Sequence, residues 1–167
     1  MAVKHRIGVC LWFDSQAEEA AKYYVGIFRN ARITCVTRFS EVGFEQHHRP
    51  AGSVMVAAFE LDGTSFTALN GGPMFKFNEA VSLQVYCETQ DEIDHYWTRL
   101  GAGGDPRAQQ CGWLKDKFGV SWQVVPDFMD TMFQDEGSPN AKRAMAAMLQ
   151  MKKIDIATLK EAFAGTV

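Results

Sequence analysis

LWFDSQAE at residues 11–18 and VYCETQDE at residues 85–92 are two versions of one pattern, and the second begins 74 positions after the first. Each starts with an apolar run typical of a β-strand, continues with a Ser or Thr, and places a Glu three residues after that hydroxyl. The hydroxyl oxygen can accept a hydrogen bond from the third amide of a helix, while the Glu side chain returns to the backbone N–H of the cap. Both stretches therefore predict a strand that leads into a helix through a capping box.

A second repeat lies further along each half of the chain. Residues 63–67 (GTSFT) and residues 119–123 (GVSWQ) are both a glycine turn that enters a short strand. Self-similarity of this kind indicates a duplicated supersecondary unit. Together the repeats predict an α+β chain built from two copies of one strand–helix–strands module.

The first module spans residues 1–73 and the second, shorter one spans residues 74–126. The hydrophobic pattern of the first predicts strands at 7–13, 32–39, 53–61 and 65–69, and a helix at 15–28. Asp62-Gly63 joins the last two of these strands and is typical of a type I′ hairpin. The second module is predicted to hold strands at 81–87, 110–115 and 121–125, and a helix at 90–100.

Residues 127–167 form a helical extension after Pro126. Ser138-Pro139 and Asp155 are typical helix starts, and Gly165 is a typical stop. The apolar faces of these helices are rich in methionine and lie beyond both modules, so they need a cover; the residues are Met129, Met132, Met145 and Met148. We therefore expect a homodimer whose contact includes this extension.

Composition excludes several classes of function. The chain has 17 basic and 20 acidic side chains and a net charge of −3, so we expect neither nucleic acid nor a membrane surface as a partner. Its apolar runs are short and no cleavage pattern follows them, which predicts a cytoplasmic protein without a signal peptide. Four cysteines are scattered without a C-x-x-C pair, and their mostly apolar neighbours predict reduced, buried packing residues.

Six stretches of the sequence resemble one known family. They are CLWFD at 10–14, TALNGGP at 67–73, FKFNEA at 75–80, CGWLKD at 111–116, FGVSWQVVP at 118–126 and MLQMKKID at 148–155. With these the chain resembles the PhnB-like family, which also carries a 3-demethylubiquinone-9 3-methyltransferase label and belongs to the vicinal-oxygen-chelate superfamily. The resemblance implies two βαβββ modules of the glyoxalase/bleomycin resistance/dioxygenase-like fold, which form a cupped sheet, followed here by C-terminal helices.

The methyltransferase label does not fit the sequence. A nucleotide-type cofactor is usually held by a glycine-rich turn between a strand and a helix. Here Gly71-Gly72 precedes a proline, and the glycines of residues 101–104 follow a helix. We therefore expect no cofactor and no methyl transfer.

In the metal enzymes of this superfamily, the resemblance implies ligands on the first and last strands of each module. The last-strand positions, four residues after the turn glycine, hold Thr67 and Gln123, and neither is a carboxylate. Neither first strand carries a histidine. The four histidines of the chain lie elsewhere in the sequence, at His5, His47, His48 and His95. The sequence therefore predicts no metal at the usual site.

Strand alternation indicates which side chains line the cup. The more polar faces of the first strands, together with the last-strand positions, give the candidate ligand-binding residues Cys10, Trp12, Thr67, Gln84 and Gln123, and Trp113 is added as a second indole that would flank the cup with Trp12. Each has an alternative structural role: Gln123 as a core amide, the tryptophans as packing residues, and the cysteines as inert thiols. Asn70 is expected to cap the Gly71-Gly72 turn.

Glu79 and Asp116 are the carboxylates closest to these strands, so they are the candidate general bases, with turn or solvated roles as the alternative. The first hypothesis is a protein that binds a small organic molecule without a metal, with enzymatic activity left open. The alternatives are a metal-dependent lyase, isomerase or dioxygenase-like enzyme with ligands such as Gln84, Gln123 and Glu79, and a drug-sequestering protein like the bleomycin-resistance members.

Overall fold

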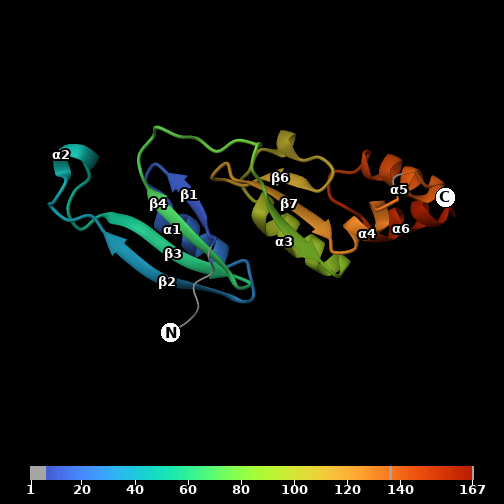
Figure 1. Cartoon of the computed structure of the whole chain (residues 1–167), viewed down its shortest axis with the longest axis horizontal. Helices are drawn as coiled ribbons and strands as arrows, with labels where there is room; N and C mark the ends of the chain where they lie inside the picture. The colour runs from blue at the N-terminus through green and yellow to red at the C-terminus, as the bar shows by residue number, and fades with distance from the viewer. Residues whose placement is uncertain (1–6, 136, 167) are drawn as a thin grey trace. The chain divides into compact units, whose positions relative to one another are not determined.

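The computed structural model describes residues 7–135 and 137–166, and the chain divides into two compact units, residues 1–77 and 78–167 (Figure 1). Both units contain a small sheet and helices, which confirms the predicted α+β class. The helical extension belongs to the second unit.

The first unit has the predicted βαβββ order. Its elements are β1 (Val9–Phe13), α1 (Ala17–Val25), β2 (Ala31–Arg38), α2 (Phe44–His47), β3 (Val54–Leu61) and β4 (Thr64–Asn70). The sheet order is β1-β4-β3-β2, with β1 parallel to β4 and the other pairs antiparallel. Asp62 and Gly63 both have positive φ angles, 44° and 81°, which confirms the hairpin between β3 and β4.

The start of α1 differs from the prediction. Its N-cap is Gln16 without a side-chain cap, so the capping box predicted at Ser15 is wrong. Instead, Asn70 Oδ1 accepts a hydrogen bond of 2.8 Å from the Ala17 amide, and Asn70 Nδ2 donates to the Val54 carbonyl. Because β4 lies beside β1, its last residue reaches the first turn of the helix that follows β1. The predicted role of Asn70 as a cap of the next turn is therefore also wrong.

The second unit has one strand fewer than the first. Its elements are β5 (Leu83–Cys87), α3 (Gln90–Gly101), the short 3₁₀ helix η1 (Pro106–Ala108), β6 (Trp113–Lys115) and β7 (Ser121–Pro126), in the sheet order β5-β7-β6. Where the first unit has β2, this unit has a glycine-rich turn and η1. Gly104 passes so close to the Lys115 carbonyl that an added Cβ would lie 1.9 Å from its oxygen. The cap predicted at Thr89 is confirmed, because Thr89 Oγ1 accepts from the Glu92 amide. The Glu92 carboxylate, however, accepts from the Glu88 amide and not from the predicted amide of Thr89.

The extension forms α4 (Met129–Phe133), α5 (Pro139–Met148) and α6 (Ile156–Ala164). The predicted caps at Ser138 and Asp155 and the stop at Gly165 are confirmed. The segment between α5 and α6 is tied to its own unit, since Gln90 of α3 donates to the Ile154 carbonyl and accepts from the Ile156 amide. Ile154 itself is fully buried. The predicted homodimer stays a prediction.

The cysteines are less uniform than predicted. All four are free thiols, but only Cys87 is buried and Cys111 is half-buried. Cys10 and Cys35 are exposed, so the prediction of buried packing is wrong for them: Cys10 lies on the outward face of β1, and Cys35 on the edge strand β2. No helix within the described residues is long and apolar enough to cross a membrane.

Candidate ligand pocket of the second unit

A row of three predicted site residues crosses the second sheet. Gln84 of β5 is the register partner of Gln123 of β7, and Gln123 is also the partner of Trp113 of β6. The opposite face of β5 is buried through Val85 and Cys87, as the alternation predicted. The sheet thus presents these polar and aromatic side chains on one face.

Helix α4 closes one end of this face and creates a pocket of about 380 Å³. Its walls come from β5, β7 and α4, and the lining residues are Gln84, Tyr86, Gln123, Val125, Met129, Asp130 and Phe133. Trp113 is not among them. Tyr86 lies two residues after Gln84, and strand alternation places it on the same face of the strand. The α4 residues could not be predicted from the sequence, since their position depends on how the chain turns after Pro126.

Two hydrogen bonds orient the amides of the pocket. Tyr86 Oη donates to Gln84 Oε1 over 2.9 Å, and Gln123 Nε2 donates to Ser82 Oγ over 2.7 Å. Within the described part of the chain, Gln84 Nε2 and Gln123 Oε1 have no protein partner. One donor and one acceptor therefore remain available on neighbouring strands.

The charged group among the described lining residues of the pocket is negative. Asp130 is its one ionisable carboxylate, and none of the described lining residues is a lysine, arginine or histidine. Val125, Met129 and Phe133 supply apolar walls. This combination favours a neutral or cationic molecule over an anion, because an anion would meet a negative charge without a compensating cation.

The predicted residues of the first unit form a separate group. Cys10 and Thr67 are register partners on β1 and β4. Trp12 has a packing role: its Nε1 donates to the Gly72 carbonyl over 2.8 Å, and its ring meets Phe75 edge-on at 5.0 Å. A Cβ on Gly71 would lie 2.1 Å from the indole, so the ring packs directly on this glycine.

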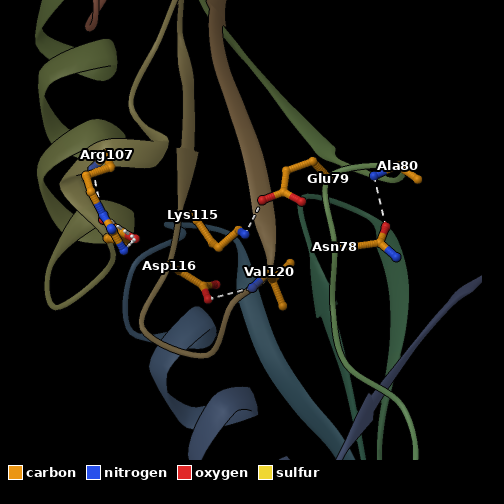
Figure 2. A network of polar contacts seen from close by, with 8 residues as sticks. Asn78, Glu79, Ala80, Arg107, Lys115, Asp116 and Val120 are labelled. Carbon is orange, nitrogen blue, oxygen red and sulfur yellow. Dashed lines mark hydrogen bonds and ion pairs between the residues drawn. The ribbon is translucent and has the colours of Figure 1, made fainter.

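Neither predicted general base lines the pocket. Glu79 forms an ion pair with Lys115 of β6, and the hydrogen bond from that ammonium lowers the pKa of the Glu79 carboxyl (Figure 2). Asp116 is 2% exposed and accepts hydrogen bonds from the Phe118 and Val120 amides and from Trp122 Nε1. Asp116 thus stabilises the turn between β6 and β7, which is the alternative role considered for it from the sequence.

The donor set does not fit the usual metal centre of this fold. The strand positions that would hold ligands carry a thiol, a hydroxyl and two amides: Cys10, Thr67, Gln84 and Gln123. Among the residues that the structure describes, no three His, Cys, Asp or Glu side chains form a group able to hold a metal ion. Glu79, one of the atypical ligands considered above, is paired with Lys115 outside the pocket.

Comparisons with known proteins place the chain in a family. The model of the 3-demethylubiquinone-9 3-methyltransferase family matches residues 5–125. The PhnB protein from Bacillus cereus is 34% identical over 72% of this chain and 99% of its own, with a TM-score of 0.61. Protein PA1353 from Pseudomonas aeruginosa has the same fold at 18% identity, over 74% of this chain and 98% of its own, with a TM-score of 0.55. A search of curated proteins gives no match. Helices α4, α5 and α6 all follow the region that the family model matches.

Proposed function

This chain belongs to the 3-demethylubiquinone-9 3-methyltransferase (PhnB-like) family, and from that premise we propose that its second unit binds a small, neutral or cationic organic molecule in the pocket between sheet and α4. Methyl transfer is not part of the proposal, because no glycine-rich turn joins a strand to a helix in the sequence. Binding requires no metal, since the pocket has one carboxylate and two amides.

One observation carries the proposal. Gln84 Nε2 and Gln123 Oε1, on paired positions of β5 and β7, are a donor and an acceptor without protein partners in the described structure. Binding sites for small molecules typically combine apolar walls with a few well-placed polar groups, in volumes of about 300–1,000 Å³. The pocket of about 380 Å³ has both features. A carboxamide, or a carbonyl beside a hydroxyl, is the chemistry that complements this pair.

The test uses 4-hydroxybenzamide as a neutral, planar probe and benzoate as an anionic control of similar size. Calorimetric titration should detect binding of the amide and much weaker binding of benzoate. Gln123→Met keeps the length of the side chain but removes both its acceptor oxygen and the amide group that donates to Ser82, so it should weaken amide binding about tenfold, the value of one hydrogen bond. Gln46→Met, the same change at an exposed glutamine of α2, is the matched control.

Equal affinity of wild type and Gln123→Met for the amide would contradict the proposed contact, and absence of binding to wild type would contradict the choice of ligand chemistry. Elemental analysis of the dialysed protein checks the metal-free part of the proposal. A stoichiometric amount of zinc, iron or manganese would contradict it.

A further inference from the structure

A second hollow lies within the C-terminal helices. It has a volume of about 500 Å³ and is lined by Phe133 of α4 and by residues of α5 and its C-cap: Ala141, Lys142, Met145, Ala146 and Leu149. We call it the α5 groove. Two of its apolar side chains remain solvent-exposed, Met145 by 38% and Leu149 by 52%.

The α5 groove follows one stripe of the helix. Ala141, Met145 and Leu149 are spaced by four residues, so they lie one above another along about 12 Å of helix axis. The alanines are small enough to leave the groove open, and the methionine can adapt to a chain of variable shape. A long, narrow, mainly apolar surface of this kind suits a flexible hydrocarbon chain.

Phe133 lines both the α5 groove and the pocket next to Gln84 and Gln123. The polar pocket and the apolar groove therefore share this residue as part of their linings. We propose that the ligand is an amphiphile whose neutral polar head occupies the pocket and whose alkyl chain extends past Phe133 into the α5 groove. This inference rests on the proposed function and specifies its class of ligand.

The distribution of charge selects the head group. Asp130 lies in the pocket, whereas the cation Lys142 lies in the α5 groove. An anionic head would be repelled at the pocket and attracted to the groove, the reverse of the proposed orientation. A neutral head with a donor and an acceptor fits the amide pair instead.

The groove is also a feature of the extension rather than of the matched family region. All of its lining residues, and the α4 side of the pocket, follow residue 125, where the family model ends, although Leu149 lies in the stretch at 148–155 that resembles the family. Gln84 and Gln123 lie within the matched region. The head-group contacts are thus placed on the family's sheet, and the chain contacts on the added helices.

A homologous series of probes tests the inference. N-methyl-, N-butyl- and N-octyl-4-hydroxybenzamide are titrated by calorimetry at concentrations where the octyl compound is monomeric. Because burial of each methylene in an apolar site changes the Kd by up to about fourfold, affinity for wild type should rise about two- to fourfold per added carbon. Met145→Gln and Leu149→Gln should flatten this dependence and leave the affinity of the methyl compound unchanged.

Two variants serve as controls. Gln123→Met should weaken all three homologues by the same factor, since it acts on the head. Met74→Gln makes the matched polar change at an exposed methionine of the first unit. It should leave the affinities of all three homologues, and their dependence on chain length, as in wild type.

Four results would overturn the inference. Binding of all three homologues with equal affinity would contradict the alkyl-chain site in the α5 groove and leave the proposed function of the pocket unaffected. Absence of binding for every homologue would contradict both the chain site and the proposed function. Sodium octanoate binding as tightly as the octyl amide would identify a carboxylate site at Lys142. Loss of a dimer in Met145→Gln by light scattering, without change in the chain-length dependence, would identify the groove as an interface between copies.

Discussion

Asp116→Asn is the substitution for which the structure gives the clearest energetic expectation. The carboxylate is buried, and its Oδ1 accepts from the Phe118 and Val120 amides at 2.9 and 3.0 Å. Its Oδ2 accepts from Trp122 Nε1 at 2.8 Å, and Trp122 is itself buried. Asparagine has almost the same shape but only one acceptor oxygen. With that oxygen retained toward the two backbone amides, the new NH₂ group must face the indole N–H.

This donor–donor contact removes one charge-assisted hydrogen bond and leaves a buried indole unsatisfied, which costs about 1.5–3 kcal/mol. The two remaining bonds also change from charged to neutral, so we expect a total loss of about 3 kcal/mol in the free energy of unfolding of the chain. For a chain of this length the melting temperature should fall by roughly 6–12 °C.

Thermal unfolding followed by near-ultraviolet circular dichroism measures the effect through the tryptophans. Asp105→Asn is the matched control, since Asp105 is also an aspartate of the second unit that accepts from a nearby amide but is partly exposed. Trp122→Phe removes the same bond from the donor side and should also destabilise the unit. A melting temperature for Asp116→Asn within the scatter of the Asp105→Asn control would refute the structural role of this carboxylate.

Three further changes test other parts of the fold. Gly71→Ala should displace the Trp12 indole, which a Cβ would approach to 2.1 Å, and so shift tryptophan emission and cost about 1–3 kcal/mol in a urea titration. Asn70→Ala should cost about 1–3 kcal/mol by the same assay, because the first amide of α1 loses its acceptor. Burial, with Glu92 and Asp127, raises the pKa of the Cys87 thiol to about 12. The stabilisation that the folded chain gains from keeping this thiol neutral is therefore present below about pH 8.5 and is lost as the pH rises toward 12. Cys87→Ala should reduce this loss of stability at alkaline pH.

The two capping boxes show how far local sequence predicts this fold. Both stretches carry the same spacing of hydroxyl and Glu, yet only Thr89 caps its helix. At α1 the amide acceptor comes from Asn70, which is 53 residues away from Ala17 in the sequence. A long-range acceptor of this kind leaves no trace in the spacing of nearby residues, so the prediction at Ser15 failed although the helix itself was found.

The difference between what local spacing predicts and what long-range contacts decide also applies to the pocket. Gln84 and Gln123 were predicted because strand alternation and the distance from a turn glycine place them on one face, and the register of β5 and β7 pairs them. Asp130 and Phe133 could not be predicted, since they become pocket residues only through the path of the chain after β7. Asp116 was predicted as a candidate base with a turn role as the alternative, and its hydrogen bonds to the Phe118 and Val120 amides favour the turn role.

Trp12 and Gln123 illustrate what separates a packing residue from a binding residue in this chain. Both lie on the more polar face of a strand, and both were predicted to line a ligand site with packing as the alternative. The one donor of the Trp12 indole is satisfied by the Gly72 carbonyl, and its ring is covered by Phe75. Gln123 satisfies its amide N–H group at Ser82 and keeps its oxygen without a protein partner among the described residues. Capacity for a ligand therefore follows from a polar atom that the fold leaves unpaired in a cavity, and this criterion favours the second sheet of this chain.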